Sequence, residues 1–233
     1  MIFLKNAIVT GGSSGIGLSI SKKLLSLGFK VYAVGRDFSN SDVDDENFIK
    51  VKCDMLDVHF FIDTVKNINK KSPVFLLVNN AGIGYFGLHE ELNLKKIHEI
   101  VTINLEIPMI LSQILMRTLK KNKGYIINIS SIEAKKTSPH GCAYGASKAG
   151  LTHFSESLFD ENRKYGVKIV TIHPDITKSN FYRNADFKEG LSLDTFLNPD
   201  DIADAVEFIL NMRSNILSTD ITLRPQKHMI SKK

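Results

Sequence analysis

The 233-residue sequence predicts an α/β fold in a single domain, residues 1–233, built on a doubly wound parallel sheet with helices on both faces. Short apolar runs bounded by turns alternate with longer segments of helical period, which is the pattern of repeated βαβ units. A glycine-rich turn, TGGSSGIG, joins the first apolar run to the first helical segment. The hydrophobic fraction of 43% is sufficient for one sizeable core at this length.

Seven apolar runs are predicted to be strands because turns bound each of them. They are Ala7–Thr10, Val31–Gly35, Ile49–Cys53, Val74–Val78, Gly124–Ser130, Lys168–His173 and Asp220–Leu223. Helices are expected between them, as crossovers from one strand to the next.

Four intervening segments carry clear helix signals, and they span residues 16–27, 94–120, 143–165 and 199–212. The first ends before Gly28, which is typical of the residue that follows a helix. The second contains Pro108, which should bend it. The last begins with a proline and two aspartates, as expected at a helix N-terminus. Residues 37–47 are polar and too short for a good helix, so a loop or a single turn is expected there.

Charge and cysteine content narrow the classes of function. The net charge is +5, but the lysines are spread along the chain, so no nucleic-acid partner is expected. No stretch approaches the roughly 18 apolar residues of a membrane span, and no positive region precedes the apolar run near Met1, unlike a secretion signal. Cys53 and Cys142 form neither a disulfide framework nor a metal-ligand pattern. We therefore expect packing cysteines, no metal, no membrane and a cytoplasmic location.

The glycine turn has the spacing TGxxxGxG, from Thr10 through Gly11 and Gly15 to Gly17. Glycines at these positions let the backbone approach a pyrophosphate at a helix N-terminus. The turn lacks the GK[ST] ending of a mononucleotide P-loop, which disfavours ATP or GTP hydrolysis. Taken alone, the string is also compatible with an ordinary glycine turn.

The end of the second strand reads AVGRD and bears on the choice of cofactor. An acidic side chain at this point accepts hydrogen bonds from a ribose 2′-hydroxyl, whereas an arginine pairs with a 2′-phosphate. Gly35 stands where the acidic residue would be, and Arg36 follows it, so NADP(H) is favoured over NAD(H). Asp37 leaves two alternatives open, because it would either pair with Arg36 or reach the ribose itself.

Tyr144 and Lys148 stand four residues apart on the same face of a predicted helix. A tyrosine has a reference pKa of about 10, and a nearby unpaired ammonium lowers it by about one to three units. Such a phenol would have useful acid/base strength near neutrality. An exposed helical pair without chemistry is the alternative if nothing else accompanies it.

In this order, TGGSSGIG, the NNAG of Asn79–Gly82, Asn104, Ser131 and the Tyr144/Lys148 pair resemble the short-chain dehydrogenase/reductase family. The resemblance covers nearly the whole chain. It implies a Rossmann-type fold and hydride transfer between a nicotinamide and a carbonyl or alcohol substrate. Relatives of this length commonly pair through their long helices, so the resemblance also implies a homodimer or homotetramer.

The resemblance implies four catalytic residues. Tyr144 donates a proton to the substrate oxygen, and Ser131, thirteen residues earlier, hydrogen-bonds the same oxygen. The adjacent Ser130 is expected to cap or pack instead. Lys148 is similar to the residue that holds the nicotinamide ribose and lowers the pKa of the tyrosine.

Asn104 matches the fourth member, which relays protons through a water on its backbone carbonyl. Pro108, four residues later, has no N–H to donate to that carbonyl and crowds it, which gives a physical reason for the carbonyl to be free. A core asparagine in a bent helix is the alternative.

The resemblance also implies a set of cofactor-binding residues. The NNAG stretch matches the backbone beside the adenine ribose, with Asn79 bonding between strands. Asp54 matches the acid that recognises adenine, whereas an isolated aspartate at this point would be a helix cap. HPDITKS resembles the family's PGxVxT segment at the carboxamide, but Asp175 replaces a glycine and Ser179 a threonine, which puts the local backbone in doubt. The full set is Gly11, Ser13, Ser14, Gly15, Ile16, Gly17, Arg36, Asp54, Asn80, Ala81, Gly82, Tyr144, Lys148, Ile176 and Ser179.

Residues 180–197 are expected to form a loop over the site that sets substrate choice. Its aromatic and basic residues allow either an apolar or an anionic carbonyl compound. Glu133, His140 and Tyr85 are further pocket candidates, with surface or packing roles as the alternative. The leading hypothesis is an NADPH-dependent carbonyl reductase. The alternatives are an NAD-dependent alcohol or sugar dehydrogenase and a non-catalytic dinucleotide-binding protein.

Overall fold

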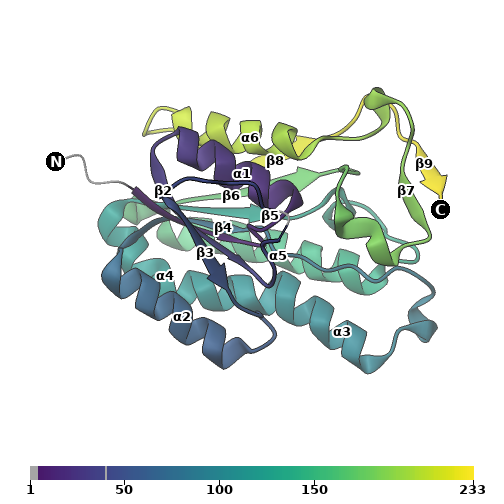
Figure 1. Ribbon diagram of the computed structural model, residues 1–233, viewed down its shortest axis with the longest axis horizontal. Helices are drawn as coiled ribbons and strands as arrows, with labels where there is room; N and C mark the ends of the chain where they lie inside the picture. Colours follow the sequence, from purple (N-terminus) through teal and green to yellow (C-terminus); the bar gives the residue numbers. More distant parts are fainter. Residues whose placement is uncertain (1–4, 40) are drawn as a thin grey trace.

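The computed structural model describes residues 5–39 and 41–233 and has a seven-stranded parallel sheet at its centre (Figure 1). The strands run in the order β3-β2-β1-β4-β5-β6-β8. Their bounds are β1 Lys5–Thr10, β2 Phe29–Gly35, β3 Phe48–Lys52, β4 Val74–Asn79, β5 Tyr125–Ile129, β6 Lys168–Pro174 and β8 Asp220–Leu223. The winding direction reverses between β1 and β4, which is the doubly wound topology predicted from the sequence.

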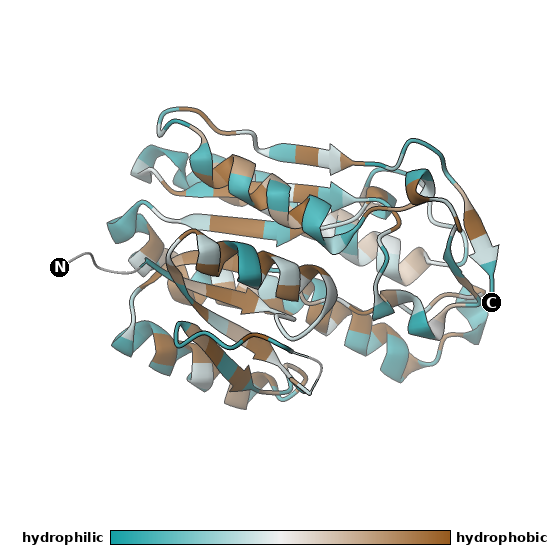
Figure 2. Cartoon of the chain, turned by 45° about the horizontal axis from the view of Figure 1, so that its top comes forward, coloured by the Kyte–Doolittle hydropathy of each residue, from teal (hydrophilic) through white to brown (hydrophobic). Residues whose placement is uncertain are grey.

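Helices cover both faces of the sheet (Figure 1). One face carries α1 (Gly15–Ser26) and α6 (Pro199–Asn211), and the other carries α2 (Val58–Lys71), α4 (Ile107–Asn122) and α5 (Cys142–Asn162). The strands and the inner faces of the helices are hydrophobic in Figure 2, which is why each helix packs on the sheet. The fold class is confirmed.

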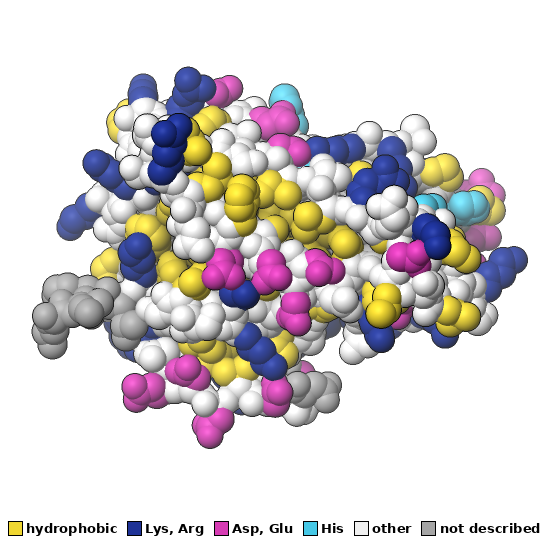
Figure 3. All heavy atoms as spheres, turned by 90° about the horizontal axis from the view of Figure 1, so that it is seen from above, with side chains coloured by type: hydrophobic (Ala, Val, Ile, Leu, Met, Phe, Trp, Pro, Cys, Tyr) yellow, Lys and Arg dark blue, Asp and Glu magenta, His cyan; other side chains and the backbone are white. Residues whose placement is uncertain are grey.

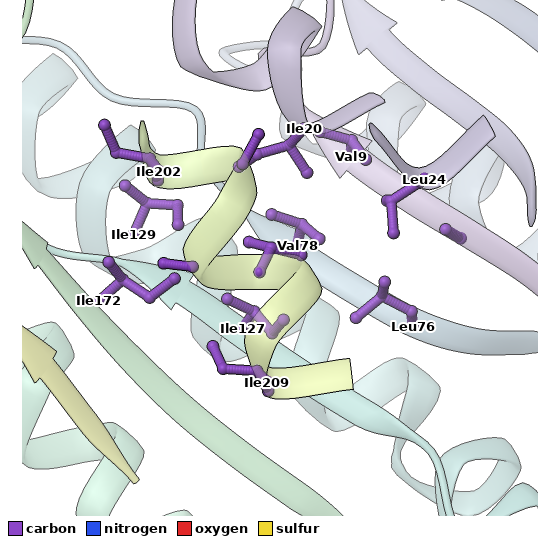
Figure 4. Close-up of a cluster of buried hydrophobic side chains, with 14 of the residues drawn as sticks. Val9, Ile20, Leu24, Leu76, Val78, Ile127, Ile129, Ile172, Ile202 and Ile209 are labelled. Carbon is purple, nitrogen blue, oxygen red and sulfur yellow. The ribbon is translucent and has the colours of Figure 1, made fainter. Parts of the chain in front are cut away.

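Two buried hydrophobic clusters hold these layers together. On one face, Ile20 and Leu24 of α1 and Ile202 and Ile209 of α6 lie against the strands (Figure 4). Figure 3 looks down on the outside of this layer, where Lys23 of α1 lies 2.9 Å from Asp204 and 2.8 Å from Glu207 of α6. On the other face, the second cluster is formed by Phe61, Leu111, Leu115, Leu119 and their neighbours.

The predicted strands are all confirmed, with ends that differ by at most two residues. The described part of residues 37–47 is a loop, as expected, and residue 40 lies outside the described residues. Helix α2 was not among the four helices that the sequence predicted from clear signals. Two short strands, β7 (Phe187–Glu189) and β9 (Ile230–Lys232), were also not predicted. They pair with each other rather than with the main sheet.

The helical stretch from Leu94 is interrupted near Pro108, as predicted. An α-helix, α3 (Leu94–Val101), passes into a π-helical turn over Thr102–Glu106 before α4 begins. Pro108 is the second residue after this turn and has no N–H for the carbonyl of Asn104. The interruption thus falls where the proline removes a hydrogen bond from the helix.

The segment Leu94–Asn122 is the one described stretch that could cross a membrane by length and composition, contrary to the expectation that none would. Half of its most apolar window is buried inside the fold. Because Leu111, Leu115 and Leu119 fill the second cluster, core packing explains its apolar character.

The two cysteines are both free and do not pair with each other. Cys53 is buried, as a packing residue should be. The packing role expected for Cys142 is wrong, since this side chain is exposed on the first turn of α5.

Leu115→Ala should lower the free energy of unfolding by about 2–5 kcal/mol, because it leaves a cavity in a fully buried cluster. Urea unfolding followed by circular dichroism measures this loss. Leu191→Ala is the matched control, since Leu191 is 90% exposed and its truncation should change stability by less than about 0.5 kcal/mol. Equal losses in the two variants would contradict the assignment of the core.

Candidate active site

A cavity opens at the carboxyl ends of the strands, beside the neighbouring strands β1 and β4, between which the winding direction reverses. Most of the predicted site residues line it. These are Gly11, Ser13, Ser14, Gly15, Ile16, Arg36, Asp54, Asn80, Ala81, Gly82, Ser131, Tyr144, Lys148 and Ser179. Gly17, Asn104 and Ile176 are not in contact with the cavity and lie behind its wall.

The glycine turn is shaped for close backbone approach. Gly11 and Gly15 have φ values of 66° and 52°, in the region that favours glycine. A Cβ on Gly17 would lie 2.1 Å from the Gly11 carbonyl oxygen, so no other residue fits. Ser14 is the residue before α1, so the helix N-terminus opens into the cavity. This arrangement suits an anionic phosphate.

Hydrogen bonds join the glycine turn to the NNAG segment. The backbone N–H groups of Asn80 and Ala81 both donate to the Thr10 hydroxyl at 3.0 Å. The Asn80 side chain donates to the Thr10 carbonyl at 2.9 Å. The Asn79 side chain donates to Asn128 of the neighbouring strand at 2.7 Å, which is the interstrand hydrogen bond expected from the sequence. The two loops therefore form one rigid floor under the cavity.

Tyr144 and Lys148 are both buried on the inner face of α5. The Lys148 Nζ donates to the Ile129 carbonyl at 2.8 Å, at the end of β5. It lies 6.0 Å from the centroid of the Tyr144 ring. The exposed-pair alternative is wrong, because the phenol and the ammonium both face the cavity.

Burial moves both groups toward their neutral forms. Burial raises the pKa of Tyr144 to about 12; the Ser131 hydroxyl opposes the rise, and the Glu133 charge adds to it. Burial lowers the pKa of Lys148 to about 8. The expected lowering of the tyrosine pKa by the lysine is therefore wrong, because desolvation is the largest influence on the Tyr144 pKa and Lys148 is not among the groups that shift it.

The two adjacent serines have different surroundings. The Ser131 hydroxyl accepts the Glu133 N–H at 3.2 Å and faces the phenol of Tyr144. The Ser130 hydroxyl donates to the Lys148 carbonyl at 3.1 Å and lies 3.0 Å from the Thr152 hydroxyl. Both line the cavity, but Ser130 is engaged in holding α5 against β5.

Asn104 is fully buried, and its side chain braces the site. Its Oδ1 accepts the Ile83 N–H at 2.9 Å, and its Nδ2 donates to the Ile83 carbonyl and the Ser147 hydroxyl, both at 3.0 Å. Ser147 in turn donates to the Tyr144 carbonyl at 2.7 Å. Asn104 therefore links the NNAG loop to α5, while its own carbonyl faces the proline that cannot donate to it.

Arg36 lines the cavity at the end of β2, as predicted. The Asp37 carboxylate instead accepts the N–H and the hydroxyl of Ser39, each at 2.9 Å. These bonds lower the pKa of Asp37. Among the described residues, no ion pair joins Asp37 to Arg36, so the guanidinium is available to a ligand.

Asp175 fits its position without a glycine-like backbone. Among the described non-glycine residues only Lys123 and His140 have positive φ, so Asp175 carries no such strain. Its buried carboxylate accepts the Ile176 N–H at 2.8 Å and the Arg224 Nε–H at 3.1 Å. The sequence left the backbone of this segment in doubt because Asp175 replaces a glycine. The structure resolves that doubt with the ion pair between Asp175 and Arg224, which joins residues far apart in the sequence.

Phe86 contacts a predicted catalytic residue but was not among the residues predicted from the sequence. Its ring packs on Tyr144 with centroids 5.6 Å apart. No spacing rule points to it, and the one available signal is its place just after the NNAG loop. Of the other pocket candidates, Tyr85 donates to Glu99 at 2.6 Å, and His140 is exposed.

The described residues contain no group of three or more His, Cys, Asp or Glu that could hold a metal ion.

Comparisons with known proteins identify the family of this chain. The family model for short chain dehydrogenases matches residues 5–189. The chain is 32% identical over 198 residues to a sorbitol-6-phosphate 2-dehydrogenase of Klebsiella pneumoniae, covering 79% of this chain and 73% of that protein. It is 30% identical over 226 residues to a 3-oxoacyl-acyl-carrier-protein reductase of Rickettsia bellii, covering 92% of both.

Solved structures share the fold. An alcohol dehydrogenase of the archaeon Thermococcus sibiricus, complexed with 5-hydroxy-NADP, superposes with a TM-score of 0.85 at 23% identity, covering 97% of this chain and 99% of that one. A 4-hydroxyisoleucine dehydrogenase complexed with NADH gives a TM-score of 0.84 at 23% identity, covering 95% and 97%. Because the family match spans most of the chain and curated relatives align along most of their lengths, the chain belongs to the short-chain dehydrogenase/reductase family of oxidoreductases.

Proposed function

We propose that this chain is an NADPH-dependent oxidoreductase that transfers hydride reversibly between the nicotinamide and a carbonyl or secondary alcohol, with Tyr144 as the acid/base. One observation carries the proposal: the buried Tyr144 and Lys148 face the same cavity as the glycine turn. A surface pair would have no substrate to act on. The buried Tyr144 and Lys148, by contrast, lie beside the glycine turn that would hold a phosphate, so a ligand could reach them in an environment shielded from solvent.

The residues present fit a dinucleotide. The cradle at Gly11 and Gly17 admits no side chain, and the N-terminus of α1 opens onto it. When bound, the nicotinamide supplies or accepts the hydride. The proposed contacts are the glycine turn for the pyrophosphate, Asn80 to Gly82 and Asp54 for the adenosine, and Lys148 for the nicotinamide ribose. Ile176 and Ser179 are proposed to hold the carboxamide.

The proton chemistry is proposed to run through this chain's own groups. At neutral pH the raised pKa of Tyr144 keeps its phenol protonated, which is the form a carbonyl reductase needs. Tyr144 gives that proton to the substrate oxygen as the carbonyl carbon accepts hydride, while Ser131 donates a hydrogen bond to the same oxygen. Lys148 stabilises the resulting phenolate, and the Asn104 carbonyl holds the water through which the proton returns.

NADP(H) is proposed over NAD(H) because Arg36 lines the cavity without a carboxylate partner among the described ion pairs. A guanidinium pairs with a 2′-phosphate in bidentate fashion. The related structures include complexes with an NADP derivative and with NADH, so the family admits both cofactors.

An NAD-dependent alcohol or sugar dehydrogenase remains the second candidate, favoured by the similarity to a sorbitol-6-phosphate dehydrogenase. A non-catalytic dinucleotide-binding protein would not need Ser131 and Tyr144. We further propose a cytoplasmic homodimer or homotetramer that pairs through the long helices, whose outer face exposes Val101 and Met109.

Tyr144→Phe should lower kcat/KM for carbonyl reduction by about 10²- to 10⁴-fold, because it removes the proton donor. The Kd for NADPH should stay within about threefold, since the ring remains. Initial rates and fluorescence titration measure the two effects, and Tyr165→Phe on the surface is the control. Tight NADPH binding by a wild type that turns over no carbonyl would instead support the non-catalytic alternative.

Arg36→Asp should reduce the ratio of kcat/KM with NADPH to that with NADH by at least about tenfold, because a 2′-phosphate would meet a carboxylate. The same substitution at the exposed Arg163, away from the cavity, should leave the ratio unchanged. An unchanged ratio in Arg36→Asp would reject the cofactor assignment.

Lys148→Met should inactivate the enzyme yet stabilise its fold at neutral pH. The folded pKa of about 8 lies below the reference value of 10.5, so the unfolded chain binds more protons between these values. Wild-type stability therefore rises with pH through this window, and the full penalty, about 3 kcal/mol, applies below pH 8.

The stability advantage of Lys148→Met should accordingly be largest near pH 7 and fade by about pH 10.5. Urea unfolding at several pH values measures it, with the exposed Lys121→Met as control. A difference that does not vary with pH would show that burial of the ammonium carries no such cost.

A further inference from the structure

His173 is a fully buried histidine at the end of β6, immediately before Pro174 and Asp175, which line the cavity. The proton chemistry proposed at Tyr144 does not use this side chain. A buried imidazole needs partners for its ring nitrogens, because a polar atom left unpaired away from water costs free energy. The neighbours of the two nitrogens therefore indicate what His173 does.

The first neighbour of His173 is the backbone of Ser131. Nδ1 lies 3.1 Å from the Ser131 carbonyl oxygen. A carbonyl oxygen can only accept, so Nδ1 carries a proton and donates it there. The Ala134 N–H donates to the same oxygen at 3.1 Å and closes the local turn. The Ser130 N–H donates to the Ile172 carbonyl at 2.8 Å, and beyond this bond the chain leaves β5. The His173 side chain thus adds one more bond between β6 and the departing chain.

The second neighbour of His173 is Asp220 of β8. Nε2 lies 2.8 Å from Oδ2 of the Asp220 carboxylate. Because Nδ1 already carries a proton, Nε2 and the carboxylate hold one further proton between them. The other carboxylate oxygen accepts from the Lys135 Nζ. Lys135 ends the 3₁₀ turn Ile132–Ala134 that Ser131 begins, so the contacts form a closed ring that joins β6, β8 and this turn.

The direction of the Ser131 hydroxyl depends on this turn. The hydroxyl accepts the Glu133 N–H at 3.2 Å, so its place follows the backbone that His173 holds. Tyr144 is positioned separately, by α5. The two hydroxyls must nevertheless reach the same substrate oxygen, and a displacement of about 1 Å at a reacting group can cost about 100-fold in rate.

We propose that His173, oriented by Asp220, is a positioning residue whose Nδ1–H holds the Ser131 backbone so that the Ser131 hydroxyl meets the substrate oxygen beside Tyr144. The inference rests on the proposed function, because it assigns His173 a part in that reaction. The place of a single N–H group, rather than the size or polarity of the buried side chain, then decides the rate.

The test compares His173→Asn with His173→Gln. The asparagine amide N–H lies near the place of Nδ1, whereas the glutamine amide N–H lies near the place of Nε2, so only asparagine keeps a donor for the Ser131 carbonyl. Reduction of methyl benzoylformate, ethyl acetoacetate and diacetyl is measured with NADPH and with NADH. The kcat should fall by at least about tenfold in His173→Gln and stay within about threefold of wild type in His173→Asn. The Kd for NADPH should stay within about threefold in both variants.

A merely structural role would not separate the two variants. Each leaves one polar neighbour without its partner, so urea unfolding should show similar losses of stability in both. His153→Gln, the same substitution at an exposed histidine of α5, is the matched control. Equal kcat values in His173→Asn and His173→Gln overturn the proposal. If His173→Gln does not fold, Asp220→Leu removes the anchor of the ring instead, and a wild-type kcat in that variant overturns the proposal.

The outcomes separate the positioning role from the proposed function. Carbonyl reduction that is lost in Tyr144→Phe but is equal in the two His173 variants leaves the oxidoreductase intact and rejects the positioning role. The absence of reduction of all three carbonyls with both cofactors rejects both proposals.

Discussion

The buried ammonium of Lys148 is the constraint on which the active-site end of this protein depends. Its Nζ is held by the carbonyl of Ile129 at the end of β5, which fixes α5 against the sheet. Ser130 adds a second bond between the same elements. A charge enclosed in this way opposes folding, so the two large hydrophobic clusters on either side of the sheet must offset it.

The same burial sets the protonation states of Tyr144 and Lys148. Desolvation shifts their pKa values in opposite directions, each toward the neutral form, because burial penalises a charged group. The phenol is thereby kept as a proton donor. A bound dinucleotide and substrate would change this balance, since their charges and hydroxyls enter the same space.

Several hydrogen bonds and one ion pair brace the segments around the cavity. Asn104 joins the NNAG loop to α5 through Ile83 and Ser147, and Thr10 joins the same loop to the glycine turn. Asp175, which follows β6, accepts a hydrogen bond from Arg224, which follows β8, and so joins the ends of these two strands. The chemistry proposed at Tyr144 thus depends on a frame of hydrogen-bonded and ion-paired groups around the cavity.

Much of this could be predicted from the sequence because its signals are local. Apolar runs and helical periods specified the strands and the main helices, and glycine positions specified the phosphate turn, since backbone conformation there depends on each residue and its neighbours. Pro108 located the break in the helix from Leu94. The spacing of Tyr144 and Lys148 placed them on one face of α5.

Only the tertiary structure decided what depends on contacts between distant segments. The burial that raises the tyrosine pKa, the Asp175–Arg224 pair and the approach of Phe86 to Tyr144 each join residues far apart in the chain. The pairing of β7 with β9 is of the same kind. A linear pattern records which residues are present, but desolvation and long-range pairing exist only after the chain has brought those residues together.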